Sequence, residues 1–143
     1  MEAALIDTDT LSEISRGNLR VLSWAKEYLA EHGRLTVSAV TVFERLRGYR
    51  AAIQRGRPFK PQLLRFQAFA STCRILAVDH AVADEAATLW AHLGARARGA
   101  LGDILIAATA SAYQLPLVTR NHQDFAAMAK VPEIHLTLQD WSR

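Results

Sequence analysis

Four acidic residues lie just after a predicted strand or near the start of a predicted helix. Asp7 directly follows an apolar stretch at residues 3–6, and Glu44 lies early in the helix after the second strand. Asp103 lies in the first turn of a later helix, and Asp124 lies just beyond the fourth strand. The carboxyl ends of parallel strands form the edge of an open α/β sheet where ligands bind. If the four carboxylates converge at such an edge, they form a strongly negative site.

Converging carboxylates require a cation. Two negative charges about 4 Å apart cost on the order of 4 kcal/mol at an effective dielectric constant near 20. A ligand set made only of oxygen atoms favours magnesium or manganese, whereas zinc is usually bound by histidine or cysteine. The five histidines show no paired ligand spacing. The acids therefore predict a hard divalent metal ion.

Each acid also has a plain structural explanation. Glu44 completes the pattern Thr41-x-x-Glu44 and Asp124 the pattern Asn121-x-x-Asp124, both of which have the spacing of a capping box. Asp103 near a helix N-terminus stabilises the helix dipole by a few tenths to about 1 kcal/mol. Capping alone accounts poorly for Asp103, because an apolar helix face follows it one turn later.

The apolar pattern predicts the elements that position these residues. Strands are expected over residues 3–6, 35–38, 75–78, 117–119 and 134–136. Helices are expected over residues 12–16, 21–31, 40–55, 63–70, 82–97, 101–113 and 125–130. The first helix begins as the first strand ends, because Thr10 and Glu13 have capping-box spacing. This alternation predicts one α/β domain over residues 1–143, with a parallel sheet covered on both faces.

Charge and cysteine content narrow the class of protein. The net charge of +3 and the pI near 9.4 come mostly from arginine, since only three of the seventeen basic residues are lysines. Arginine matches phosphate geometry, so nucleic acid is a candidate partner, although charge alone fits an ordinary basic surface equally well. Cys73 is the only cysteine, and no apolar run is long enough to span a membrane. We expect a cytoplasmic protein.

Four segments together resemble the signature positions of PIN-domain ribonucleases, and most nearly those of the VapC toxins of bacterial toxin-antitoxin pairs. They are LIDTDTLSE around Asp7, VTVFERLRG around Glu44, GDILIAATA around Asp103 and TRNHQDF around Asp124. The resemblance implies a three-layer α/β/α sandwich with a mainly parallel sheet. It also implies a Mg²⁺- or Mn²⁺-dependent endoribonuclease, frequent homodimerisation and a VapB-type antitoxin that inserts into the acidic site. Asp9 departs from the family, which commonly has asparagine there.

The resemblance and the chemistry of the acids assign the same candidate roles. The metal ligands and catalytic residues are Asp7, Glu44, Asp103 and Asp124, which would bind one or two ions that activate water and stabilise charge on the scissile phosphate. The candidates that orient waters are Thr8, Thr119 and Asn121. The candidates that contact RNA phosphates are Arg96, Arg98 and Arg120, although charges at helix ends facing solvent explain these equally well.

Basic and aromatic residues interleave over residues 49–69, across a helix pair broken by prolines. Core packing explains part of this pattern. The resemblance makes the projecting hairpin part of the groove that receives an amphipathic antitoxin helix.

Two other functions remain open. An apolar strand followed by D-x-D-T also begins haloacid-dehalogenase-type phosphatases, but Asp103 has no second acid after it and no lysine lies at a plausible strand end. The chain is alternatively a catalytically silent module that keeps the fold only to bind a partner or RNA. We favour the nuclease.

Overall fold

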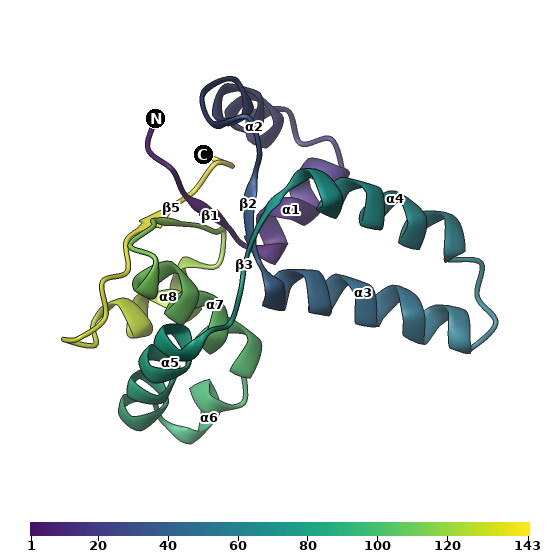
Figure 1. Cartoon of the computed structure of the whole chain (residues 1–143). Helices are drawn as coiled ribbons and strands as arrows, with labels where there is room; N and C mark the ends of the chain where they lie inside the picture. Colours follow the sequence, from purple (N-terminus) through teal and green to yellow (C-terminus); the bar gives the residue numbers. More distant parts are fainter.

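The computed structural model describes residues 1–143, except for the side chain of Ala97. Its strands are short, and every paired strand runs parallel to its neighbour (Figure 1). One sheet has the order β1-β4-β5, with β1 (Leu5–Ile6), β4 (Leu117–Val118) and β5 (Leu138–Gln139). The other pairs β2 (Thr36–Ser38) with β3 (Arg74–Leu76). Because β1 lies beside β2, the strands follow one another in the order β3, β2, β1, β4, β5.

Helices connect the strands along the whole chain. They are α1 (Thr8–Ser15), α2 (Leu19–His32), α3 (Ala39–Gln54), α4 (Lys60–Thr72), α5 (His80–His92), α6 (Ala95–Arg98), α7 (Leu101–Ala112) and α8 (His122–Ala129). Among the described residues, no helix is long and apolar enough to cross a membrane.

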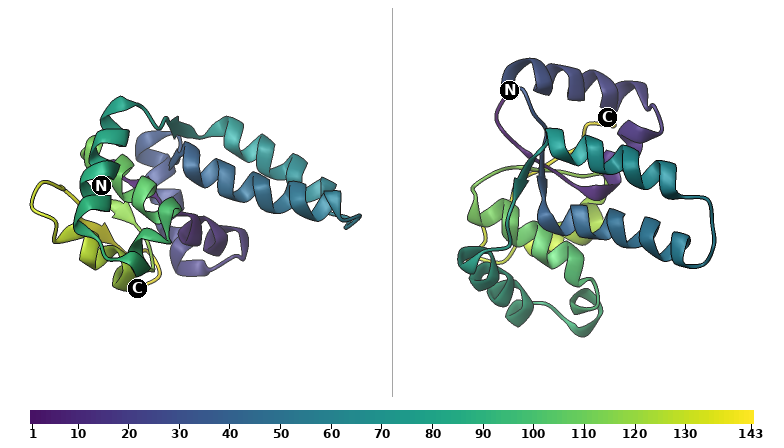
Figure 2. Two further views of the ribbon diagram at one scale, coloured as in Figure 1. Left: turned by 90° about the horizontal axis from the view of Figure 1, so that it is seen from below. Right: turned by 45° about the vertical axis from the view of Figure 1, so that its right-hand side comes forward.

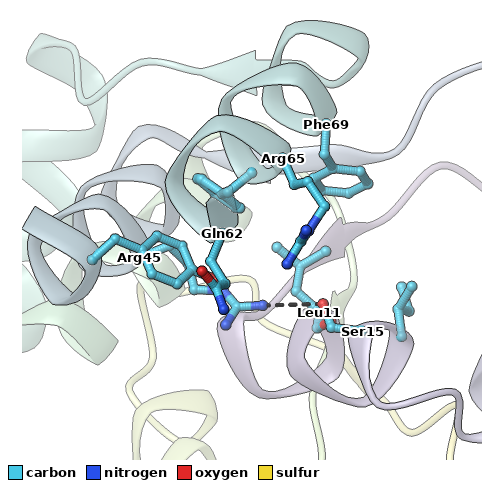
Figure 3. A pocket seen from close by; sticks show the side chains of 9 residues that line it. Leu11, Ser15, Arg45, Gln62, Arg65 and Phe69 are labelled. Carbon is cyan, nitrogen blue, oxygen red and sulfur yellow. Dashed lines mark hydrogen bonds between the residues drawn. The ribbon is translucent and has the colours of Figure 1, made fainter. Parts of the chain in front are cut away.

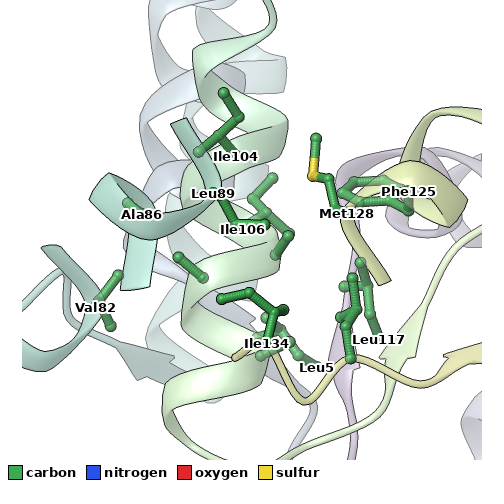
Figure 4. Close-up of a cluster of buried hydrophobic side chains, with 14 of the residues drawn as sticks. Leu5, Val82, Ala86, Leu89, Ile104, Ile106, Leu117, Phe125, Met128 and Ile134 are labelled. Carbon is green, nitrogen blue, oxygen red and sulfur yellow. The ribbon is translucent and has the colours of Figure 1, made fainter. Parts of the chain in front are cut away.

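Hydrophobic side chains cover both faces of the strands. Successive strand residues point to opposite faces, so Leu5 and Leu117 pack into one cluster with α5, α7 and α8 (Figure 4), whereas Ile6 and Val118 pack into a second with α1 and α2. Leu5, Ile6, Leu117 and Val118 are completely buried. The predicted α/β/α sandwich with a parallel sheet is therefore confirmed.

The helices α3 and α4 form a hairpin that projects away from the strands (Figures 1 and 2). Their connection runs through residues 55–59, between the helices predicted over 40–55 and 63–70, and Pro61 lies in the first turn of α4. Inside the hairpin, the rings of Tyr49 and Phe66 have centroids 6.1 Å apart. The interleaved aromatic residues thus partly hold the two helices together.

The start of the first helix differs from the prediction. The helix α1 begins at Thr8 rather than Ser12, because the carboxylate of Asp7, and not the hydroxyl of Thr10, caps it. Asp7 Oδ1 accepts a hydrogen bond from the Thr8 backbone N–H at 2.7 Å. The capping-box prediction for Thr10 was wrong because Thr10 lies inside the helix, with its hydroxyl near the carbonyl oxygen of Val118.

Two later elements also differ. The helix predicted over residues 82–97 ends at His92, because Leu93 is extended, with φ −94° and ψ 147°, and is buried in the core; α6 follows as a separate turn. The strand predicted over residues 134–136 is irregular, and β5 begins at Leu138. The apolar residues of that segment instead pack into the hydrophobic cluster beside α7 and α8.

Candidate active site

Asp7 is buried at the carboxyl end of β1, with only 5% of its surface exposed. The register of β1 and β4 brings Thr119 beside it, and Thr119 Oγ1 donates a hydrogen bond to Asp7 Oδ2 at 2.8 Å. Burial, together with the charges of Asp9 and Asp103, raises the pKa of Asp7 to about 7, although the hydrogen bonds from Thr119 and Thr8 act in the opposite direction. Asp7 is thus a carboxylate whose charge the protein alone does not compensate.

Glu44 reaches the same region from α3. Thr8 Oγ1 donates a hydrogen bond to Glu44 Oε1 at 3.0 Å, and Arg47 Nη2 lies 3.9 Å from Glu44 Oε2. Glu44 has no capping role, because Ser38 caps α3 by accepting from the Thr41 backbone N–H at 3.0 Å. The alternative explanation of Thr41-x-x-Glu44 as a capping box was therefore wrong. Glu44 instead lines a cavity together with Asp7 and Asp103.

The close approach of Glu44 to α7 depends on Gly102. A Cβ atom at this position would lie 2.6 Å from Glu44 Oε2, well inside van der Waals contact. Gly102 has no such atom, so the carboxylate of Glu44 packs directly against the first turn of α7. This contact brings Glu44 next to the turn that carries Asp103.

Asp103 and Asp124 complete the set of predicted acids. Burial raises the pKa of Asp103, and the carboxylates of Glu44, Asp124 and Asp9 raise it further, so these charges lie within electrostatic reach of one another. Asp124 is exposed at the start of α8, where its Oδ2 accepts from Asn121 Nδ2 at 2.9 Å. The structure therefore brings the four acids together, with Asp124 outermost.

A cavity of about 380 Å³ lies between these side chains. It is lined by Asp7, Thr8, Asp9, Ser12, Glu44, Arg47, Asp103 and Asn121. Thr119 lies completely buried behind Asp7, and Asp124 is held at the rim by Asn121. Carboxylate, hydroxyl and amide groups thus dominate a single concave surface.

Three lining residues, Asp9, Ser12 and Arg47, were not among the predicted site residues. Asp9, noted in the sequence only as a departure from the family, lines the cavity and accepts from the Arg120 backbone N–H at 3.2 Å. Arg47, one helical turn after Glu44, brings the cavity's only guanidinium group. The signals were the two-residue spacing from Asp7 to Asp9 and the three-residue spacing from Glu44 to Arg47, which places both side chains on one helix face.

The three arginines predicted to contact phosphate lie outside the cavity lining. Arg120 Nη1 lies 2.6 Å from Glu13 Oε1, and Glu13 also pairs with Arg16. Arg98 Nε donates to the carbonyl oxygen of Trp90 at 3.0 Å, and Arg96 is exposed on α6. Two of the three guanidinium groups therefore already contact other groups of the chain.

The chemistry of the donors fits Mg²⁺ or Mn²⁺. The cavity lining contains no histidine or cysteine. The pKa values of Asp7 and Asp103 are raised first by burial and then by the charges of neighbouring acids, so uncompensated negative charge lies there. Within the described part of the chain, no three His, Cys, Asp or Glu side chains are grouped closely enough to hold one ion. Magnesium commonly binds through one or two carboxylates and keeps several waters, which suits this looser arrangement.

The fold and the cavity define an α/β/α protein with an acidic site at the carboxyl edge of parallel strands. Residues 4–131 match the PIN domain family, and the chain belongs to that family. This match confirms the resemblance inferred from the sequence and favours a nuclease over the phosphatase alternative. A search of curated proteins found no match.

Several solved structures have the same fold, and one of them is described as a toxin-antitoxin complex. The chain matches one in VapBC2 from Rickettsia felis bound to a promoter DNA fragment, with a TM-score of 0.75 at 20% identity over 98% of this chain and 99% of that chain. It matches FitAcB from Neisseria gonorrhoeae with a TM-score of 0.70 at 28% identity over 94% and 96%. It matches a toxin-antitoxin complex from Klebsiella pneumoniae with a TM-score of 0.63 at 26% identity, again over 94% and 96%.

Proposed function

We propose that this protein is a metal-dependent endoribonuclease and the toxin of a VapBC-type toxin-antitoxin pair. The observation that carries the proposal is the crowding of Asp7, Asp9, Glu44 and Asp103 around one cavity, with Asp124 at its rim. Membership of the PIN domain family and the likeness to chains of VapBC complexes support it. We further propose that residues 1–143 act as one domain in the cytoplasm.

Each residue has a role that follows from its contacts. Asp7, Glu44 and Asp103 would hold Mg²⁺ or Mn²⁺, in part through waters, and Asp124 would contribute from the rim. An ion bound there would supply activation of water and neutralisation of charge on the scissile phosphate. Thr119 fixes the carboxylate of Asp7, and Thr8 fixes that of Glu44. These hydroxyl groups keep the carboxylates oriented toward the cavity. Groups that hydrogen-bond to metal ligands commonly orient them in this way.

The deciding experiment is RNA cleavage with and without Mn²⁺. We expect Asp7→Asn and Asp103→Asn each to abolish cleavage while circular dichroism shows an intact fold. Asp84→Asn is the matched control, because Asp84 is an exposed acid of α5 outside the cavity lining. Cleavage that persists in both site variants would refute the assignment. Unchanged RNA with the wild-type protein and Mn²⁺ would instead favour a silent binding module.

Arginines supply the proposed contacts to RNA phosphates. Arg47 lies within the cavity lining, and the exposed Arg96 lies on α6, next to the start of α7. Arg98 and Arg120 would have to exchange their present contacts with Trp90 and Glu13 for a phosphate. Substituting one phosphate-binding arginine should weaken RNA binding. The slope of log K against log salt concentration should fall by about the amount expected for one phosphate contact.

The antitoxin is proposed to bind a second cavity, of about 410 Å³, between α1 and the α3–α4 hairpin (Figure 3). Its wall combines apolar side chains such as Leu11 and Phe69 with Arg45, Gln62 and Arg65. Arg45 Nε and Gln62 Oε1 are buried without a hydrogen-bond partner among the described residues. An amphipathic helix fits this wall if its apolar side chains pack on Leu11 and Phe69 and its acidic side chains lie beside Arg45 and Arg65.

Co-expression tests this partner. The protein encoded by the neighbouring reading frame should co-purify with the wild-type chain. It should be lost with Arg65→Glu but kept with Arg50→Glu, since Arg50 is an exposed arginine of the same hairpin outside the cavity lining. Equal loss in both variants would contradict this location. We also propose a homodimer, which sedimentation of the purified chain tests directly.

A further inference from the structure

A third cavity, of about 550 Å³, lies directly beside the acidic one. Its size falls within the range of cavities that bind small organic groups. The two cavities share Glu44, Arg47 and Asp103 in their walls. A molecule held in the acidic cavity can therefore extend into its neighbour without leaving the surface of the protein.

The wall of this neighbouring cavity is largely apolar. Phe43, Leu101 and Val78 line it from α3, α7 and the segment after β3, and 59%, 53% and 42% of their surfaces are exposed. Exposed apolar side chains that gather around one cavity commonly mark a binding site. Phe43 directly precedes Glu44 in the sequence, so the exposed ring and the acidic site are held by the same turn of α3.

Arg47 connects the apolar wall with the acids. Its guanidinium carbon lies 5.4 Å from the centre of the Phe43 ring, and its Nη2 lies 3.9 Å from Glu44 Oε2. One cation thus lies over an aromatic face on one side and beside a carboxylate on the other. A ligand that fits this surface has a flat apolar part joined to an anionic part.

We propose that the third cavity binds an unpaired nucleobase of the RNA next to the scissile phosphate, with the Phe43 ring stacked on the base. The proposal rests on the proposed ribonuclease function, because it takes the phosphate from that site. An aromatic ring can stack on any nucleobase that is not paired within an RNA helix. The subsite therefore selects single-stranded RNA, and Arg47 lies between the base and the phosphate.

The test combines a protein change with a substrate change. Cleavage of a single-stranded RNA is measured with the natural base, or with an abasic nucleotide, at each position beside the mapped cut. We expect one abasic position to lower kcat/KM by about tenfold or more, as stacking energies imply. Phe43→Ala should show the same loss on intact RNA and no additional loss on the abasic RNA. Phe43→Trp should restore the rate.

The matched control is Trp24→Ala, because Trp24 is an exposed aromatic residue of α2 that does not line this cavity. It should cleave like the wild type. Full activity of Phe43→Ala, or losses that multiply when both changes are combined, would overturn the proposal. A change of sedimentation from dimer to monomer in Phe43→Ala, with the abasic effect unchanged, would instead make this face a contact between copies of the chain.

RNA affinity separates this proposal from the proposed function. The same four combinations are measured in EDTA by fluorescence anisotropy of labelled RNA, which needs no cleavage. A wild-type protein that cuts no RNA, but loses affinity when an abasic nucleotide is moved to one position along the RNA, with no such loss in Phe43→Ala, would refute the nuclease and keep the base subsite. RNA cleavage that is unaffected by the abasic nucleotide and by Phe43→Ala would refute the base subsite and keep the nuclease.

Discussion

Replacing Asp7 by asparagine should stabilise the metal-free protein at neutral and alkaline pH. The folded protein raises the pKa of Asp7 from 3.8 to about 7, mainly because the carboxyl is buried. The pKa is therefore higher in the folded than in the unfolded chain, so the contribution of Asp7 to stability is greatest below pH 3.8. It is lost progressively as the pH rises to about 7. Asparagine carries no charge and loses nothing over this range.

The size of the effect follows from the same pKa. Between pH 5 and pH 7 each pH unit changes the free energy of unfolding by about 1.4 kcal/mol, and little changes above pH 7. The advantage of Asp7→Asn over the wild type should thus grow by about 3 kcal/mol from pH 5 to pH 8. For a domain of this length that corresponds to roughly 6–12 °C in Tm. Any hydrogen bond that asparagine fails to make is independent of pH and cancels from this difference.

The assay is thermal unfolding followed by circular dichroism in EDTA at pH 5 and pH 8. Asp84→Asn is the control, since Asp84 is exposed on α5 and its loss should alter stability equally at both pH values. A Tm advantage of Asp7→Asn that is the same at both pH values would refute the reasoning. So would a wild-type advantage that grows toward pH 8, because it would mean that the buried carboxylate is stabilised in its charged form.

Three other predictions concern the same site. Mn²⁺ should raise the Tm of the wild-type protein at pH 8 more than that of Asp7→Asn; equal shifts would place the ion elsewhere. Gly102→Ala should keep the Tm but lower the cleavage rate, because the new Cβ displaces the Glu44 carboxylate; Gly48→Ala, inside α3 with open space around it, should keep the rate and raise the Tm slightly. Asp9→Asn should lower the pKa of Asp7, so the acidic limb of the cleavage profile should move to lower pH; an unmoved limb would contradict the coupling.

The position of the acidic edge was predictable because it depends on short-range sequence order. A buried apolar strand followed by an acid places a carboxylate at the strand end, and parallel strands put those ends together. Asp7 and Thr119 follow paired strand residues, which explains their contact. The alternation of Leu5 and Ile6 between two hydrophobic clusters likewise follows from strand geometry alone.

The features that were not predictable depend on how separate helices pack. Nothing in the sequence near Gly102 indicates that Glu44 lies against it, because the two residues are far apart in the chain. The exposure of Phe43 could not be predicted for a related reason, since an aromatic residue in an amphipathic helix is usually assigned to the core. The irregular segment after α8 was predicted to be a strand because its residues are apolar. They are apolar because they pack into the hydrophobic cluster, and not because the segment pairs with a strand.

Asp9 shows why crowding of charge matters more than any single acid. The hydroxyl of Thr119 has one proton, and its 2.8 Å contact with Asp7 is shorter than its contacts of 3.4 and 3.5 Å with Asp9. Asp9 is therefore left mainly with the Arg120 backbone N–H and the Thr10 hydroxyl, while its charge raises the pKa of Asp7. A neutral asparagine would keep a hydrogen bond to that N–H without the repulsion. The extra carboxylate thus makes the metal-free site less stable and increases the electrostatic attraction for a divalent ion.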